Sequence, residues 1–258
     1  MGNTCRRIVV KVGTSSLMSA DSINLEMMRT LAAELSQLHG AGNEVMLITS
    51  GAIGFGIGKM KTGFPKSQVM RQAMAAIGQS RLMHEYENAF SAHGQVIAQV
   101  LPTHQAFSEP KYFTPLKSAV EKLLEIGAIP IINENDAVSA EEISGKAFSD
   151  NDALAALVAT GFGADLLIIL TDVDGIYSDN PKTQSMASKI SGVGQLLSWQ
   201  INQGKKSGYG LGGVGSKIAA VKKALSGGCG AAVCMARKGA ITDAVAGRCT
   251  GSFFEAKK

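Results

Sequence analysis

Short apolar runs alternate along the chain with segments whose apolar residues recur at helical spacing. The runs are rich in Val, Ile and Leu and do not alternate with polar residues, which is typical of strands buried on both faces. Strands are predicted over residues 6–12, 44–48, 95–101, 128–132, 166–170 and 231–235. Helices are predicted over residues 24–38, 68–90, 114–126, 152–160 and 217–225. Such alternation favours an α/β fold, a three-layer αβα sandwich around a mainly parallel central sheet.

Polar and glycine-rich clusters follow several of these strands or open the next helix. They lie at residues 11–15, 49–52, 133–136 together with 149–152, and 208–217. In open parallel sheets ligands bind outside the carboxyl ends of the strands, so these clusters are the candidate site. Gly51 offers unhindered backbone N–H groups at a helix start, and Lys217 opens a helix after a glycine-rich run. Both features predict an anion-binding site, although a glycine cluster alone is equally typical of a tight turn.

The composition narrows the choice of function classes. The 258 residues carry a net charge of +4, and Lys and Arg are spread without a dense block, which gives no support to nucleic acid binding. Neither a membrane span nor a signal peptide is predicted, so we expect a cytoplasmic protein. Cys5, Cys229, Cys234 and Cys249 form no CxxC pair and are expected to be reduced thiols. Gly2 suits myristoylation, but Arg6 stands where that signal has Ser or Thr.

Familiar nucleotide and metal motifs do not account for the clusters. The letters G-x-G-x-x-G occur at residues 208–213, but they follow a polar run and not a strand, so the dinucleotide-binding context is missing. Ser216 separates Gly215 from Lys217, where a P-loop has Gly and Lys adjacent. Residues 172–175 lack the further ligands of a calcium loop, and no histidine is spaced for zinc. We therefore predict no metal site in the protein itself, and expect metal to arrive with a nucleotide.

Lys11, Asp152 and Lys217 suit phosphoryl transfer to a carboxylate. A carboxylate acceptor is already ionised near neutral pH and needs no general base, so catalysis reduces to positioning and charge stabilisation. Lys11 is predicted to neutralise the transferred group, Lys217 to face the leaving phosphate, and Asp152 to orient both ammonium groups. Taken singly, Lys11 is equally typical of a snorkelling strand-end residue, and Asp152 of a helix N-cap or first-turn carboxylate.

These clusters together resemble the amino acid kinase family, and within it the members that phosphorylate glutamate. The resemblance is carried in order by residues 10–15, 49–53, 77–82, 132–138, 150–152, 170–172 and the glycine-rich run to Lys217. It covers nearly the whole chain. It implies the amino acid kinase fold, and transfer of the γ-phosphate of ATP to the side-chain carboxylate of L-glutamate, the first step of proline biosynthesis.

The resemblance also implies roles for individual residues and partners. Glutamate is expected at Ser50, Asp136 and Asn151, with Asn133 nearby. ATP is expected among Lys11, Gly13, Gly51, Thr171, Asp172, Leu211, Gly212, Gly213, Val214, Gly215, Ser216 and Lys217. Lys11, Asp152 and Lys217 are the expected catalytic residues. Similar enzymes use magnesium with ATP, form homo-oligomers and are inhibited by proline.

Residues 1–258 are expected to form a single amino acid kinase domain, with a substrate-binding half over about 1–160 and an ATP-binding half over 161–258. Many bacterial relatives carry a C-terminal PUA domain, which is not expected here. Gly215 stands where we expect a hydroxyl residue. The alternatives are kinases of acetylglutamate, aspartate, carbamate or uridine monophosphate, and a non-catalytic nucleotide-binding protein. An NAD-dependent oxidoreductase is disfavoured, because residues 11–13 end the first strand without a glycine fingerprint.

Overall fold

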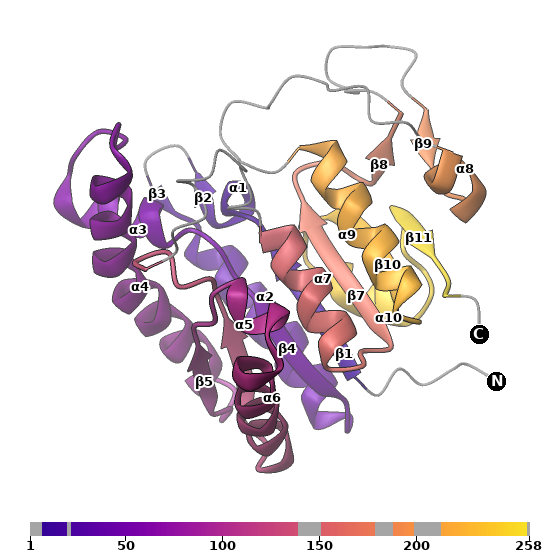
Figure 1. Cartoon of the computed structure of the whole chain (residues 1–258), viewed down its shortest axis with the longest axis horizontal. Coiled ribbons are helices and arrows are strands. Elements are labelled where there is room, and N and C mark those ends of the chain that lie inside the picture. The colour runs from indigo at the N-terminus through magenta and orange to yellow at the C-terminus, as the bar shows by residue number, and fades with distance from the viewer. Residues whose placement is uncertain (1–6, 20–21, 139–150, 179–187, 199–212, 257–258) are drawn as a thin grey trace.

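A seven-stranded sheet runs through the middle of the molecule (Figure 1). This computed structural model describes residues 7–19, 22–138, 151–178, 188–198 and 213–256. The strands are β1 (Arg7–Val12), β4 (Glu44–Ile48), β5 (Ile97–Val100), β6 (Ile129–Ile132), β7 (Leu166–Thr171), β10 (Gly230–Met235) and β11 (Ser252–Phe254). Their order is β11-β10-β7-β1-β4-β6-β5, and the pairing is parallel except between β10 and β11. The predicted, mainly parallel sheet is confirmed.

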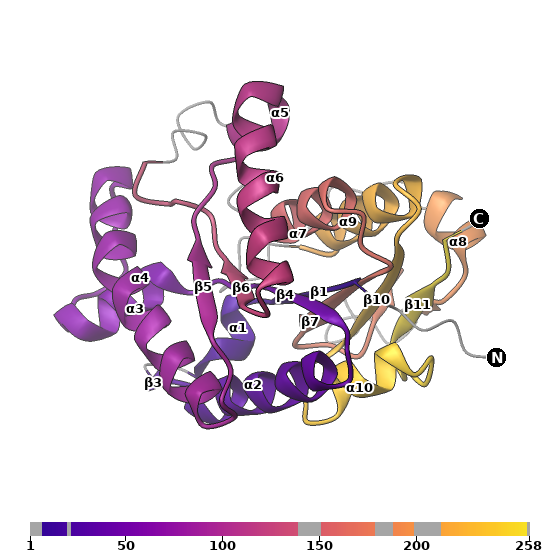
Figure 2. The same ribbon diagram turned by 90° about the horizontal axis from the view of Figure 1, so that it is seen from below.

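Helices cover both faces of the sheet, as the view in Figure 2 shows. One layer contains α2 (Leu25–Gly40), α4 (Gln68–Ser91) and α10 (Ala240–Val245), and the other contains α6 (Pro110–Glu125), α7 (Asn151–Gly161) and α9 (Val214–Ser226). Alternate residues of β1 enter separate cores, since Val10 packs beneath α2 and Val9 beneath α7 and α9. Burial of β1 on both faces explains its unbroken apolar run. The αβα sandwich is therefore confirmed.

Several short elements were not predicted from the sequence. They are α1 (Thr14–Leu17), β2 (Met18–Ser19), β3 (Ser22–Ile23), α5 (Gln105–Ser108), β8 (Ile176–Tyr177), β9 (Lys189–Ile190), α8 (Val193–Ser198) and the helix α10. Helix α6 begins at Pro110, earlier than predicted, and α9 begins at Val214, so Lys217 lies within its first turn. Among the described residues, no helix combines the length and the apolar character that a membrane span requires.

Helix α3 (Ala52–Met60) begins at the helix start expected beside Gly51, although no helical segment was predicted over these residues. Its intrinsic helix propensity is poor because it contains several glycines. The same glycines allow α3 and α4 to approach until their backbones touch. A Cβ at Gly78 would lie 1.8 Å from the carbonyl oxygen of Ala52, and one at Gly56 would lie 2.0 Å from that of Met74. Tertiary packing therefore compensates for weak local preference, and it fixes the start of α3 beside the candidate site.

Substitution of Gly78 is expected to separate these two helices. Gly78→Ala should lower the free energy of unfolding by about 1–3 kcal/mol, because the added methyl group collides with rigid backbone. The matched control is Gly58→Ala on the exposed side of α3, where a Cβ meets nothing within 4 Å. That change should be neutral or stabilise the protein by up to about 1 kcal/mol. Urea unfolding of both variants measures the difference, and equal midpoints would contradict the packing argument.

Strand β1 lies where the order of the sheet reverses. The chain passes from β1 to β4 on one side, and later returns to place β7 on the other side of β1. Ligands bind at such a switch point, outside the carboxyl ends of the strands. Lys11 is the penultimate residue of β1 and therefore stands at this position, as predicted. The assignment of residues 1–160 and 161–258 to substrate and ATP stays a prediction.

Candidate functional site

Three charged side chains from distant parts of the sequence meet at the switch point. Asp152, the second residue of α7, has no exposed surface. Its Oδ1 lies 2.5 Å from Lys11 Nζ at the end of β1, and its Oδ2 lies 3.1 Å from Lys217 Nζ in the first turn of α9. Figure 1 shows α7 and α9 side by side, which explains how one carboxylate reaches both lysines. The structure thus brings together the three predicted catalytic residues.

The electrostatics of this group favour an anionic ligand. Burial pushes the pKa of Asp152 upward, but the charges and hydrogen bonds of Lys11 and Lys217 outweigh it and lower that pKa to about 2. Asp152 is therefore ionised at neutral pH, and two ammonium groups share one carboxylate with one positive charge in excess. Lys11 is only 4% exposed, so it does not snorkel into solvent. The arrangement can neutralise a phosphate or carboxylate group placed against it.

The start of α9 adds a hydroxyl group and backbone donors. Gly213 is the N-cap of α9, and Val214 and Gly215 follow in its first turn. Gly215 has no hydroxyl group, but the next residue does: Ser216 Oγ lies 3.1 Å from Asp152 Oδ2 and 2.8 Å from the carbonyl oxygen of Gly213. Leu211 and Gly212, which were also predicted to contact ATP, lie outside the described residues.

Two further glycines leave room beside the lysines and at a helix start. A Cβ at Gly13 would lie 3.6 Å from Lys11 Nζ, so this position borders the ammonium group. Gly51 is the N-cap of α3 in the left-handed conformation, with φ of 101°, which glycine adopts without strain. The N–H groups that begin a helix have no partner within that helix and attract anions. Gly13 and Gly51 therefore occupy positions that suit phosphate approach.

A network of amide groups adjoins the three charged residues. Asn151 directly precedes Asp152, and its Nδ2 lies 2.8 Å from Ser50 Oγ, 3.0 Å from Asn133 Oδ1 and 2.6 Å from the carbonyl oxygen of Thr49. The start of α7 thus joins two groups of residues, because Asn151 reaches the ends of β4 and β6 while Asp152 reaches β1 and α9. Ser50, Asn133 and Asn151, three of the predicted substrate residues, are brought together.

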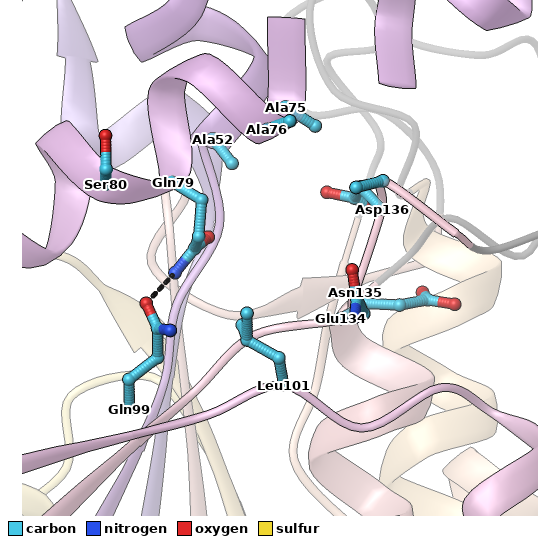
Figure 3. Close-up of a pocket in the computed structure, with 11 residues that line it drawn as sticks. Ala52, Ala75, Ala76, Gln79, Ser80, Gln99, Leu101, Glu134, Asn135 and Asp136 are labelled. Atoms are coloured by element: carbon cyan, nitrogen blue, oxygen red, sulfur yellow. Dashed lines mark hydrogen bonds between the residues drawn. The ribbon is translucent and has the colours of Figure 1, made fainter. Parts of the chain in front are cut away.

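Gln79 extends this network into a cavity, and the sequence had assigned it no role. Asn133 Nδ2 donates a 2.8 Å hydrogen bond to Gln79 Oε1, and Gln79 Nε2 donates one of 3.2 Å to Gln99 Oε1. Figure 3 shows Gln79 and Gln99 on one side of the cavity and Asp136 on the other. The signal for Gln79 was its place in residues 77–82, one of the segments that carry the family resemblance.

The cavity measures about 260 Å³, below the roughly 300–1,000 Å³ typical of sites for drug-sized ligands. Its polar lining includes Asp136, Gln79 and the buried Glu134, which the sequence analysis had also left without a role. Ala52, Ala75 and Ala76 line the side formed by α3 and α4 (Figure 3). A small ligand with both charged and apolar parts suits this space.

Thr171 and Asp172 lie at the end of β7, next to β1. Thr171 is the last residue of β7, and its Oγ1 lies 3.3 Å from Asp172 Oδ1. The backbone N–H of Ala236 donates to the carbonyl oxygen of Thr171 at 2.8 Å, which ties β7 to the chain leaving β10. Within the ranges that the structure describes, no three His, Cys, Asp or Glu side chains gather to hold a metal ion.

The chain belongs to the amino acid kinase family, whose sequence profile matches residues 6–235. A glutamate 5-kinase of Caldanaerobacter subterraneus is 44% identical over 220 residues, which cover 84% of this chain and 58% of the relative. A glutamate 5-kinase of Enterococcus faecalis is 41% identical over 226 residues, covering 86% of this chain and 83% of the relative. The chain thus spans little more than half the length of the first relative and most of the second.

Solved structures of two kinases, named for different substrates, share this fold. The UMP kinase of Bacillus anthracis superimposes with a TM-score of 0.66 at 15% identity, covering 99% of this chain and 98% of that one. A carbamate kinase from Giardia lamblia gives a TM-score of 0.66 at 16% identity, covering 96% of this chain and 98% of that one. At these identities the likeness shows the fold alone.

Proposed function

We propose that the chain transfers the γ-phosphate of ATP to the side-chain carboxylate of L-glutamate, forming L-glutamyl 5-phosphate in the first step of proline biosynthesis. The observation that carries this proposal is the pairing of Asp152 with both Lys11 and Lys217 beside the amide network of Asn151. Glutamate is favoured as the acceptor because the relatives that are about 40% identical are glutamate 5-kinases.

The reaction needs charge neutralisation more than proton transfer. A glutamate oxygen forms a bond to the γ-phosphorus while the bond from that phosphorus to the bridging oxygen breaks, and ADP leaves. The side-chain carboxylate is ionised at neutral pH, so no base is required. Lys11 stabilises the oxygens between the acceptor and the transferred group, and Lys217 stabilises the leaving phosphate. Asp152 holds both ammonium groups at fixed positions, which avoids reorganisation during the transfer.

Substrate and nucleotide occupy opposite sides of the start of α7 in this proposal. Glutamate lies in the cavity, where Asp136 binds its ammonium group and the network of Asn151, Asn133 and Ser50 borders its carboxylates. Gln79 is a positioning residue that holds Asn133. ATP lies along the start of α9, from Gly213 to Lys217, and past Thr171 and Asp172. Magnesium bound with the nucleotide supplies further charge neutralisation on the phosphates.

The family resemblance supports three further properties as parts of this proposal. They are inhibition by proline at or near the glutamate cavity, assembly into a homo-oligomer, and a cytoplasmic location. Proline carries the carboxylate and ammonium groups of an amino acid, so it can compete for Asp136 in the cavity. Adding proline to the assay below tests the first property.

The deciding experiment measures ADP release from ATP and magnesium with one acceptor at a time. Glutamate, aspartate, acetylglutamate, carbamate and uridine monophosphate are compared, and hydroxylamine traps any acyl phosphate. We expect a hydroxamate with glutamate alone. ADP formed with another acceptor would contradict the glutamate assignment, and ATP binding without turnover of any acceptor would place the chain among non-catalytic nucleotide-binding proteins.

The role of Asp136 can be tested through the substrate's own charges. Asp136→Asn should raise the KM for glutamate by about 10–100-fold with little change in kcat, because an ionic hydrogen bond contributes about 1.5–3 kcal/mol. Glutarate, which lacks the α-ammonium group, is the control acceptor. The KM for glutarate should be the same for the wild-type protein and for Asp136→Asn. A fall in kcat without a change in the KM for glutamate would contradict ammonium binding by Asp136.

A further inference from the structure

Two cysteines lie against each other outside the proposed active site. Cys234 belongs to β10, and Cys249 lies three residues before β11. Because β10 and β11 are antiparallel, with Val233 opposite Ser252, the chain at Cys249 runs back past the end of β10. Gly251 places the two cysteines beside each other, because its N–H lies 3.3 Å from Cys249 Sγ and a Cβ added to it would lie 3.0 Å from Cys234 Cα. Cys234 is 4% exposed and Cys249 is half-buried, so an oxidant reaches Cys249 first.

Cys249 has the surroundings of a reactive thiol. The hydrogen bond from Cys234 is the main cause that lowers the pKa of Cys249 to about 6; burial opposes this change. The backbone N–H of Gly251 donates to Cys249 Sγ at 3.3 Å, and the positive charges of Lys189 and Arg237 act in the same direction. These surroundings favour the thiolate of Cys249, which is the nucleophilic form of cysteine.

The charged groups around the pair are held in place from several elements. Lys189, on β9, donates to the carbonyl oxygen of Thr250 at 3.1 Å and to Asp174 Oδ2 at 2.7 Å. Arg237, after β10, is paired with Asp243 at 2.8 Å. The hydrogen bond to Cys249, burial and the negative charge of Glu34 on α2 raise the pKa of Cys234. Cys234 thus keeps its proton and remains a donor to Cys249.

We propose that Cys234 and Cys249 are a site of reversible oxidation, at which a hydroperoxide converts the two thiols into a disulfide. The Cys249 thiolate attacks one peroxide oxygen, the O–O bond breaks, and the departing oxygen takes up a proton, leaving a sulfenic acid on Cys249. The Cys234 sulfur then attacks the sulfenic sulfur. The S–O bond breaks, hydroxide leaves, and the thiol proton of Cys234 converts it to water.

The balance is complete with hydrogen peroxide as the oxidant. Two thiols lose two protons and two electrons, and one peroxide molecule takes them up to become two molecules of water. A dithiol reductant reverses the change by thiol–disulfide exchange. The proposal is independent of the phosphoryl-transfer reaction, because neither cysteine, nor Lys189, Arg237 or Glu34 beside them, is assigned to catalysis or substrate binding.

The test treats the full chain with hydrogen peroxide, alkylates the remaining thiols under denaturing conditions, and identifies peptides by mass spectrometry. We expect a peptide pair joined through Cys234 and Cys249, lighter by two hydrogens and separated again by dithiothreitol. Cys229→Ser, which alters a buried cysteine outside the pair, should leave this product unchanged. Absence of the joined peptides, or joining of either cysteine to Cys229 instead, would overturn the proposal.

Single variants separate the two chemical roles. In Cys234→Ser, dimedone should trap a sulfenic acid on Cys249, whereas in Cys249→Ser no sulfenic acid should form on Cys234. The pH dependence of alkylation by iodoacetamide gives a second measurement in the unmodified protein. Its midpoint for Cys249 should lie near pH 6, well below the usual value of about 8.5. A midpoint near 8.5, or dimedone labelling of Cys234 alone, would show that Cys249 is not the attacking thiol and would refute the mechanism.

Discussion

Lys217→Met is expected to lower kcat for glutamate phosphorylation by about 10²–10³-fold while the protein remains folded. The Lys217 side chain is 13% exposed, and its ammonium group is held 3.1 Å from Asp152 Oδ2 before any substrate binds. A donor fixed in this way stabilises charge that develops on the leaving phosphate without having to reorganise. Met preserves much of the length and apolar surface of the side chain and removes only its charge.

The measurement is steady-state kinetics with both substrates, using trapped hydroxamate as the product. Lys223→Met is the matched control, because Lys223 is an exposed lysine on the same helix, away from Asp152. It should retain normal kcat and KM. A loss that appears only in the KM for ATP would mean that Lys217 binds the ground state and the transition state equally, which contradicts its proposed role.

The positions of the strands in the sequence were more predictable than the order of the strands in the sheet. An apolar run such as β7 records burial on both faces, and that is a local property of the sequence. The position of β7 beside β1, and not beyond β5, depends on packing between segments far apart in the chain. Hydrophobic pattern alone carries no such information, so it predicted the layers and the mainly parallel sheet but not the strand order.

Among the helices that were not predicted as segments, α3 and α10 show two different physical reasons. Helix α3 contains glycines that disfavour helix in isolation, and it is stabilised by close backbone contact with α4. Helix α10 has six residues and depends on Glu34, a buried carboxylate of α2. The two Glu34 oxygens accept hydrogen bonds from the backbone N–H groups of Gly239, Ile241 and Thr242. Neither interaction is visible in a local window of sequence.

The charged part of the site was more predictable than the substrate cavity. Lys11 and Lys217 stand beside glycines at a strand end and a helix start, and that context predicts anion binding. Gln79 had no such local context, because one glutamine in a long amphipathic helix is usually a solvated residue; only its place in the resembling segment 77–82 marked it. Its contact with Asn133 depends on how α4 packs beside the end of β6. The roles of Ser50, Asn133, Asp136 and Asn151 came from the family resemblance, whereas those of Lys11, Asp152 and Lys217 were also argued from their chemistry.

Replacement of Asp152 is expected to reduce both stability and turnover. Asp152→Asn keeps the size of the side chain but leaves the ammonium groups of Lys11 and Lys217 close together without this carboxylate. Breaking a buried ion pair by removing one partner costs about 3–5 kcal/mol, and kcat should fall by at least about 10²-fold because neither lysine is held in position. Urea unfolding and hydroxamate kinetics measure the two effects.

The stability difference should depend on pH in one direction. The pKa of Asp152 is about 2 in the folded protein and about 3.9 when unfolded, so its lowered pKa contributes stability that is present above pH 4 and lost as pH falls through 2. A shift of this size corresponds to roughly 2–3 kcal/mol. The difference in the free energy of unfolding between the wild-type protein and Asp152→Asn should therefore become smaller at acid pH. A gap that stays constant from pH 6 to pH 2 would contradict an ionised Asp152.

A double variant separates the electrostatic cost from loss of packing. Asp152→Asn combined with Lys217→Met contains one buried ammonium group fewer than Asp152→Asn alone. If repulsion and desolvation of the lysines cause the instability, the double variant should be more stable than the single Asp152→Asn variant, although it carries one more substitution. Additive losses would instead show that the three side chains contribute independently. In that case Asp152 would not be the group that holds both lysines, and its proposed catalytic role would lose its physical basis.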